Sequence, residues 1–383
     1  MKFVLPTFPL RNRQRAGPPN HRGEKNVQHK PLDEGGTAAL AALCALSCHA
    51  QSNVTLYGLL DDSLAYVSNQ KGGRTFIQLS GDAQSDRWGV LGEEDLGGGY
   101  KAIFRLENGF TINNGALGQG GLEFGRQAYV GLSHPGAGSL TLGRQYDFVL
   151  DFLCPMSNGC VSSDVYAFHL GDYDRLGGER VDNAVKYMSP DIGGLHFGGL
   201  YSFGNQPGSL SRNSAVSFGA GYRRGAFQLG AAYTQIRNFV PAFDLGTPVF
   251  GASLAGAAID RYSTGGVGMS YSFGALDVRT VATFVDFRHA SQSAILRTAE
   301  TGLTYRLGPA LRLSADYAYT KLQGDHWQQV GLVADYFLSK RTDVYLHLNT
   351  MRSSAGVHAV LFPLAPSSTD AQSVASIGIR HKF

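Results

Sequence analysis

The sequence contains no uninterrupted run of 18 apolar residues, although 43% of its 383 residues are hydrophobic. A transmembrane helix needs about 20 consecutive, mainly apolar residues, so this absence excludes a helical membrane protein. Charged residues are also scarce, at 16%, and the net charge of +3 is too small to indicate a nucleic-acid partner. Glycine and aromatic residues are abundant instead, with 50 Gly, 22 Phe and 18 Tyr. This composition is typical of many short strands joined by turns.

Residues 1–50 differ in composition from the rest of the chain. Basic residues and prolines are scattered through a polar stretch, which is followed by the apolar run 37–46. That run has the length of the hydrophobic part of a signal peptide and ends in a small-x-small pattern, which predicts cleavage after Ala50. The polar stretch ahead of it is unusually long for a secretory leader. An alternative in which Cys48 is the acylated residue of a lipoprotein fits the preceding residues poorly.

Beyond residue 50, segments of about ten residues alternate between apolar and polar side chains. In the segment 311–320, for example, Leu313 and Tyr317 share one face, whereas Ser314 and Asp316 share the other. Side chains of a strand point alternately to opposite faces, so one face of each strand would meet lipid and the other water. A soluble β-sandwich alternates in the same way, and periodicity alone does not exclude it.

Sixteen such segments are recognised, and they predict an all-β fold: a 16-stranded antiparallel transmembrane β-barrel. An even number places both chain ends on one side, and sixteen strands leave an aqueous channel. Short breaks rich in turn residues are expected at the periplasmic end, and the longest breaks, 148–179, 239–260 and 354–372, are expected outside. The predicted strands are 54–67, 85–95, 100–110, 122–133, 139–147, 180–189, 195–204, 213–223, 226–238, 261–273, 276–288, 295–307, 311–323, 327–338, 342–353 and 373–383.

Five strings of residues together resemble the general porins of Gram-negative bacteria, in particular the trimeric Burkholderia and Neisseria type. They are QSNVTLYGLLDDSLAYV at 51–67, RWGVLGEEDLGGGYKAIFRLENGF at 87–110, FGRQAYVGLSHPGAGSLTLGRQYD at 124–147, RVDNAVKYMSP at 180–190 and IGIRHKF at 377–383. The resemblance implies that residues 51–383 form a porin barrel in the outer membrane, a homotrimer that lets ions and small hydrophilic solutes diffuse through. Outer-membrane lipid, lipopolysaccharide and the outer-membrane assembly machinery are the implied partners, and Phe383 resembles the signal that this machinery reads.

The resemblance also implies a constriction, because the third external loop of related porins folds into the barrel and faces arginines on the opposite wall. By motif match the wall residues are Arg87, Arg126 and Arg180, and Lys101 and Arg105 add positive charge to the lumen. The acidic candidates on or near the loop are Asp147 and Asp151, with Asp164 as a further one. Opposed charges across a narrow opening would orient dipolar solutes and disfavour apolar ones. Alternation places Arg180 with Asp182 and Lys186 on the lumen face, whereas Arg126 shares parity with apolar residues, so an interface role for it stays open.

Cys154 and Cys160 lie six residues apart in the predicted third loop, and export to an oxidising compartment permits a small disulfide between them. Most related porins lack such a pair. Too few ligands lie nearby for a metal site, and no cofactor is expected. The histidines, His169, His196, His347 and His358 among them, are interpreted as lumen or loop residues.

Two other functions compete with the porin hypothesis. An outer-membrane enzyme would need clustered catalytic groups, and the sequence contains neither a G-x-S-x-G nor an H-E-x-x-H motif. An adhesin or structural barrel would have a plugged lumen. The prediction is therefore a non-enzymatic channel, and electrical conductance distinguishes it from both alternatives.

Overall fold

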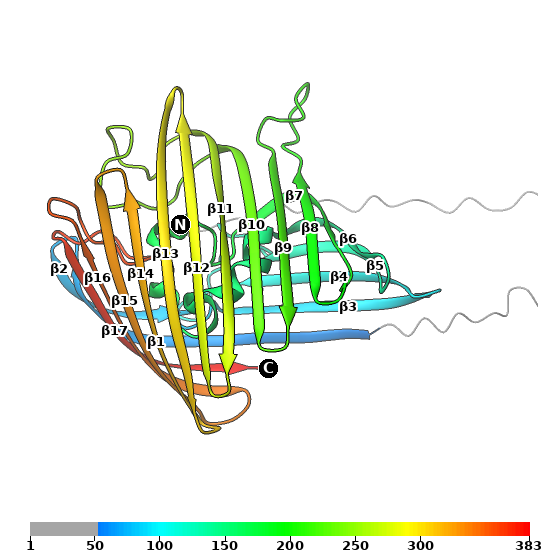
Figure 1. Ribbon diagram of the computed structural model, residues 1–383, viewed down its shortest axis with the longest axis horizontal. Coiled ribbons are helices and arrows are strands. Elements are labelled where there is room, and N and C mark those ends of the chain that lie inside the picture. Colours follow the sequence, from blue (N-terminus) through cyan, green and yellow to red (C-terminus); the bar gives the residue numbers. More distant parts are fainter. Residues whose placement is uncertain (1–52) are drawn as a thin grey trace, which may run out of the picture. The chain divides into compact units, whose positions relative to one another are not determined.

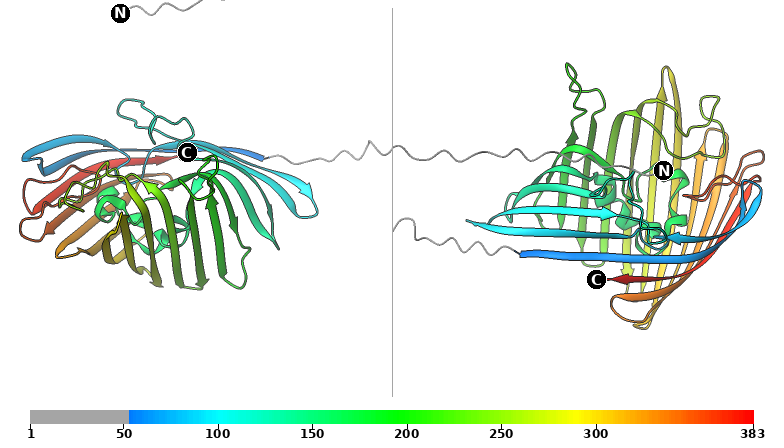
Figure 2. Two further views of the ribbon diagram at one scale, coloured as in Figure 1. Left: turned by 90° about the horizontal axis from the view of Figure 1, so that it is seen from above. Right: turned by 180° about the vertical axis from the view of Figure 1, so that it is seen from behind.

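A computed structural model describes residues 53–383, and the predicted leader with its cleavage site after Ala50 lies outside them. The described chain forms one sheet of seventeen strand segments, which curve around an interior that holds the helices (Figures 1 and 2). The strands are β1 (Asn53–Gln70), β2 (Gly73–Ser80), β3 (Arg87–Gly97), β4 (Tyr100–Gly109), β5 (Gln127–His134), β6 (Gly138–Tyr146), β7 (Arg180–Met188), β8 (Leu195–Ser202), β9 (Ala215–Arg224), β10 (Phe227–Phe239), β11 (Ile259–Phe273), β12 (Leu276–His289), β13 (Gln292–Leu307), β14 (Leu311–Leu322), β15 (Asp325–Phe337), β16 (Thr342–Ser353) and β17 (Ala371–Lys382).

The sheet closes into a barrel because its first and last strands pair. β1 and β17 are antiparallel, in a register that runs from Leu59 opposite Lys382 to Val67 opposite Val374. Phe383 continues this ladder, since its backbone N–H and C=O each bond to Gly58 at 3.0 Å. Closure pairs the first and last strands of the sheet, as a barrel in lipid requires; among residues 53–383, β2 pairs with β1 alone and so keeps one edge without a strand partner.

The second barrel strand is interrupted, which reconciles seventeen segments with a sixteen-stranded barrel. β2 pairs with residues 62–70 of β1, and β3 pairs with residues 53–59 of the same strand, so both lie along one edge of β1. The turn 81–86 separates the two halves. The predicted sixteen-stranded antiparallel barrel is confirmed, but the sequence prediction missed β2 and treated residues 68–84 as a break.

The burial of side chains is the reverse of that in a soluble β-protein. On β14, Leu313 and Tyr317 are 41% and 40% exposed, whereas Ser314 and Asp316 are 6% and 5% exposed. A soluble sandwich would bury its apolar face, so this pattern rules that alternative out and assigns the outer face to lipid. Within residues 53–383, no helix has the length and apolar character needed to cross a bilayer.

The third long connection, residues 147–179, carries the helices, and they lie within the ring of strands (Figure 2). It is held by an apolar cluster in which Phe148, Phe152 and Met156 pack against buried residues of β7 to β12. The helical segments are α2 (Phe148–Phe152), η1 (Cys154–Met156), α3 (Asn158–Val161), η2 (Val165–Ala167) and η3 (Leu170–Asp172). We call residues 147–179 the inner loop.

Glycines on the inner wall make room for the inner loop. A Cβ atom added to Gly219 would lie 2.8 Å from Cβ of Phe148, and one added to Gly221 would lie 2.6 Å from Cδ1 of Phe152. Gly268 meets Met156 in the same way. Such contacts are closer than packed carbon atoms allow, so these wall positions accept only glycine while the inner loop is in place.

Candidate functional site: a charged constriction beside the inner loop

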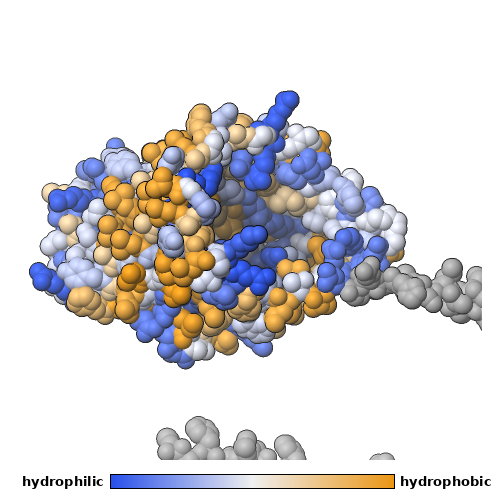
Figure 3. Space-filling view, turned by 90° about the horizontal axis from the view of Figure 1, so that it is seen from below, coloured by the Kyte–Doolittle hydropathy of each residue, from blue (hydrophilic) through white to orange (hydrophobic). Residues whose placement is uncertain are grey.

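A cavity of about 510 Å³ lies between the inner loop and the wall built by β3 to β7. Figure 3 shows a hollow in one face of the molecule with hydrophilic residues around it, while hydrophobic residues gather on the adjoining outer surface. Such a polar interior within an apolar outer face suits the passage of water and dissolved ions. The charged residues that line the cavity include Arg87, Arg105, Glu107, Arg126, Asp151 and Lys186.

Arg126 is fixed by two buried partners. Its Nε donates to Oε1 of Glu107 at 2.8 Å, and its Nη2 donates to the hydroxyl of Tyr146 at 2.8 Å. Tyr57 donates a further hydrogen bond, of 2.7 Å, to Oε2 of Glu107. Because β5 begins only at Gln127, strand alternation does not set the direction of Arg126, which explains why its parity disagreed with its position.

Arg87 and Arg105 line the same cavity, and within residues 53–383 neither forms an ion pair. Arg87 donates from Nε to the carbonyl oxygen of Ser85 at 3.0 Å. The guanidinium of Arg105 lies over the ring of Tyr57, 5.7 Å from its centroid, and its Nε is buried without a hydrogen-bond partner. Within residues 53–383, these two arginines therefore carry positive charge that is not held in a direct ion pair.

Asp151 presents the acidic side of the cavity from the inner loop. Its Oδ2 accepts from Nζ of Lys186 at 2.5 Å, and the same Nζ donates to the carbonyl oxygen of Tyr146 at 2.9 Å. Burial raises the pKa of Asp151 above its usual range, and the Lys186 ammonium opposes this shift. The pair neutralises itself, so the acid adds little net charge to the opening.

Four of the predicted residues lie away from the cavity lining, and one of them, Asp164, is 1% exposed in a separate buried cluster. Asp147 is fully buried, accepts from the backbone N–H of Val149 as the N-cap of α2 and pairs with Arg175, so it stabilises the inner loop. Lys101 is exposed at the start of β4 and pairs with Glu93 at 2.8 Å.

Arg180, the fourth, donates to the hydroxyl of Tyr146 at 2.8 Å and lies over its ring. Alternation breaks down just after it, because the β6–β7 register shifts and Asn183 adopts a positive φ of 52°. Val181 is consequently buried within the barrel, and the side chain of Asp182 is 62% exposed and pairs with Arg144. The predicted placement of Asp182 beside Arg180 on the lumen face is thus wrong, because a bulge reverses the parity.

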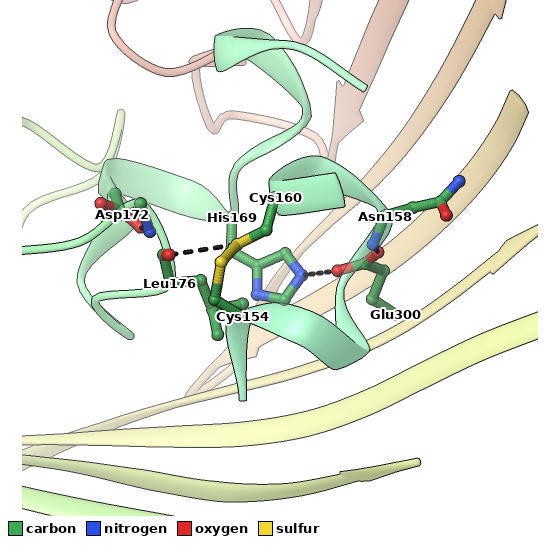
Figure 4. Close-up of a disulfide and its surroundings, with 8 residues drawn as sticks. Cys154, Asn158, Cys160, His169, Asp172, Leu176 and Glu300 are labelled. Atoms are coloured by element: carbon green, nitrogen blue, oxygen red, sulfur yellow. Dashed lines mark hydrogen bonds and ion pairs between the residues drawn. A yellow bond between two sulfur atoms is a disulfide. The ribbon is translucent and has the colours of Figure 1, made fainter. Parts of the chain in front are cut away.

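The cysteine pair of the inner loop forms a disulfide between Cys154 of η1 and Cys160 of α3, with Cα atoms 5.5 Å apart (Figure 4). Sγ of Cys160 lies 3.1 Å from the carbonyl oxygen of Leu176. Both cysteines line the cavity. The bridge therefore closes a small ring of chain at the edge of this cavity.

A buried polar network attaches the inner loop to the opposite wall. His169 is 1% exposed; its Nδ1 contacts Asp174 and its Nε2 lies 3.0 Å from Oε2 of Glu300 on β13 (Figure 4). The backbone N–H of Asn158 donates to the other oxygen of Glu300 at 2.6 Å, and Ser163 donates to Asp316 at 2.6 Å. Burial disfavours the imidazolium, but the two carboxylates outweigh it and raise the pKa of His169 well above 6.5.

Sequence reasoning identified the arginines of the cavity but missed Glu107 and the wall acid Glu300. The parity of Glu107 with Arg105 was the available signal, since both share one face of β4. No local signal joins Glu300 to His169, because 131 residues separate them along the chain.

Comparisons with known proteins agree with this architecture. A family model described as Gram-negative porin matches residues 36–356. The chain is 28% identical to an outer membrane porin protein of Bordetella pertussis and 28% identical to outer membrane porin protein 32 of Delftia acidovorans, covering 90% of this chain and 98% of each relative. It is 26% identical to the major outer membrane protein P.IB of Neisseria meningitidis, over 89% of this chain and 97% of that protein.

Solved structures show the same fold. An anion-selective porin from Comamonas acidovorans superimposes with a TM-score of 0.74 at 24% identity, covering 87% of this chain and all of that one. The trimer form of OmpT from Vibrio cholerae gives 0.65 at 15% identity, over 87% of this chain and 99% of that one.

The fold and the lined cavity define a β-barrel channel rather than an enzyme. The chain belongs to the Gram-negative porin family. It is accordingly an outer-membrane diffusion porin, whose water-filled barrel passes ions and small hydrophilic solutes.

Proposed function

We propose that solutes cross this porin through the cavity beside the inner loop, and that the cavity favours small anions. The observation that carries the proposal is the pair Arg87 and Arg105, which line the cavity and form no ion pair within residues 53–383. The other charges of the lining are the pairs Arg126–Glu107 and Lys186–Asp151 and the single carboxylate of Asp82, which is 0% exposed.

The electrostatic reasoning follows from this arrangement of charges. Two neutralised pairs contribute dipoles that orient water and dipolar solutes across the opening, whereas the two guanidinium groups without ion-pair partners outnumber the one buried carboxylate of Asp82 and leave a net positive potential. A narrow opening with low-dielectric walls concentrates that potential, which raises the local concentration of anions. The structurally similar porin of Comamonas acidovorans is itself described as anion-selective.

The test is the reversal potential of the channel in a planar bilayer under a KCl gradient. Replacing Arg105 with glutamine removes one of these two guanidinium charges and keeps a polar side chain, so we expect a lower chloride-to-potassium permeability ratio. Arg224→Gln is the matched control, because Arg224 is exposed at the end of β9, away from the cavity lining. Equal reversal potentials for wild type, Arg105→Gln and Arg224→Gln would contradict the proposed site.

We also propose that the mature chain, residues 51–383 after cleavage behind Ala50, works as a homotrimer. The solved OmpT of Vibrio cholerae that resembles it is described in a trimer form. The connection 110–126 exposes Ile112, Leu117 and Leu122 by 39%, 46% and 47%, which is unusual for a segment outside the strands and suits a contact between subunits. Native mass spectrometry of the detergent-extracted protein tests both points, since it gives the subunit number and the processed mass.

The remaining partners belong to the same proposal: outer-membrane lipid and lipopolysaccharide around the barrel, and the assembly machinery that would read Phe383. The side chain of Phe383 is 44% exposed at the end of the closing strand. The aromatic terminus thus stays partly accessible even in the closed barrel.

A further inference from the structure

A second polar cluster lies behind the cavity, where three separate parts of the chain meet. Asp82 comes from the turn between β2 and β3, Asp164 from the inner loop before η2, and His347 from β16. Asp82 is 0% exposed, Asp164 1% and His347 2%. One ligand atom of each lies within 4.8 Å of the other two.

The distances between the ligand atoms of this cluster are close to those in a tetrahedral zinc site. Nδ1 of His347 lies 3.5 Å from Oδ1 of Asp82 and 3.2 Å from Oδ2 of Asp164. Ligand atoms at the corners of a tetrahedron with zinc bonds of about 2.1 Å lie about 3.4 Å apart. Two of the three edges therefore have the required length already, and the third, between the two carboxylates, is at most 4.8 Å.

Unsatisfied atoms in the cluster point to a missing positive charge. Both carboxylate oxygens of Asp82 are buried without a hydrogen-bond partner, and so are Nδ1 of His347 and Oδ1 of Asn349. Asp61 brings a third carboxylate to the same region, because it accepts from the backbone N–H groups of Ala83 and Gln84 at 3.3 and 3.1 Å. A single imidazolium balances only one of the two carboxylates Asp82 and Asp164, and a buried, uncompensated carboxylate is strongly unfavourable.

The surroundings of the cluster hold its ligands in place. Asn349 donates from Nδ2 to Oδ2 of Asp164 at 2.7 Å, and the ring of Tyr345 stacks on that of His347 at 4.2 Å between centroids. Outer contacts of this kind orient metal ligands and raise affinity. Asp82 also borders the cavity, so the cluster lies next to the lumen.

We propose that Asp82, Asp164 and His347 bind a divalent transition-metal ion such as Zn²⁺. Mixed imidazole and carboxylate donors suit Zn²⁺ better than Ca²⁺, which prefers six to eight oxygen ligands. The bound ion fixes the turn 81–86 and the inner loop to the wall at β16. It lies next to a hydrogen bond of 2.8 Å that the backbone N–H of Val165 donates to the carbonyl oxygen of Asp82. No metal site was expected from the sequence, because Asp82, Asp164 and His347 lie far apart along the chain and meet only in the folded protein.

The test measures zinc in untagged protein extracted from outer membranes, stripped with a chelator, reloaded with Zn²⁺ and separated from free metal. We expect about one zinc ion per chain in the wild type and in His196→Gln, whose histidine is exposed and pairs with Asp191. We expect a loss of at least about tenfold in affinity for His347→Gln and for Asp82→Asn. Retention of zinc by both of these variants would overturn the proposal, as would a wild type that binds none.

Two further measurements keep the outcome clear. Resistance of each variant to unfolding in dodecyl sulfate before heating shows whether the barrel has folded. Co²⁺ loaded into the wild type should give the visible absorption of a tetrahedral site with nitrogen and oxygen ligands, and purely octahedral absorption would overturn the assignment. The zinc content does not depend on the ion selectivity of the channel, so this proposal and the proposed anion preference fail independently.

Discussion

Removing the imidazole of His169 should release the inner loop from the barrel wall. His169 is buried between Asp174 and Glu300, so His169→Ala leaves two buried carboxylates without their shared cation. Breaking a buried ion pair by removing one partner costs about 3–5 kcal/mol. Since each 1.4 kcal/mol is a factor of ten, the detached state of the loop should become roughly 100 to 4,000 times more populated.

Hydrogen exchange of the folded, detergent-solubilised protein measures this population directly. The backbone N–H of Asn158 is the reporter, because it donates to Glu300 and is protected only while the inner loop is in place. We expect exchange across residues 147–179 to accelerate in His169→Ala, with protection in β13 and β14 unchanged. The double variant His169→Ala/Glu300→Gln should recover part of the lost protection, because it removes one of the two carboxylates left without a cation.

The contact of His169 with Asp174 and Glu300 also predicts how the stability of the inner loop changes with pH. The raised pKa of His169 means that the folded state holds a proton that the unfolded chain releases near pH 6.5. The stabilisation is therefore complete below about 6.5 and is lost as pH rises through the higher folded-state value. Exchange of the inner loop, corrected for intrinsic chemistry, should rise more steeply toward alkaline pH in the wild type than in His169→Ala. Identical protection in the two proteins at neutral pH would refute the reasoning.

Two further predictions concern the packing of the inner loop. Gly219→Val should displace Phe148 and cost about 1–3 kcal/mol of loop packing, which would appear as altered single-channel conductance; Gly199→Val is the control, since its Cβ would lie 3.6 Å from the nearest atom, in Phe218. The double replacement Cys154→Ser/Cys160→Ser removes a small closed ring worth about 2 kcal/mol, so exchange in residues 148–162 should accelerate while the barrel strands stay protected. Unchanged conductance in the first case, or unchanged exchange in the second, would contradict these expectations.

The barrel could be predicted from the sequence because lipid and water impose opposite demands on neighbouring residues. Leu313 and Asp316 on β14 display this alternation openly. β2 was missed because its polarity departs from that of the other strands: Ile77 and Leu79 pack inward against buried apolar residues, whereas the outer face places Phe76 between the polar residues Arg74 and Gln78. A search for an apolar outer face and a polar inner face does not recognise such a strand.

The constriction was predictable only in part, for a similar reason. Arg105 lies on a regular strand and its direction follows from alternation, but Arg126 precedes β5 and Arg180 precedes a bulge. Local periodicity carries no information at such positions. The contacts of the inner loop with the wall could not be predicted from local sequence, since His169 and Glu300 meet only once the barrel wall has formed.

The ladder between β1 and β17 has a consequence for how this protein is made. The two strands come from opposite ends of the chain, so the seam of the ring waits for the last residue to be synthesised. Until then both margins of the sheet expose unpaired amide and carbonyl groups, which a bilayer tolerates poorly and which invite association with other chains. A chain that ends before β17 therefore lacks the partner of β1 and leaves the sheet open.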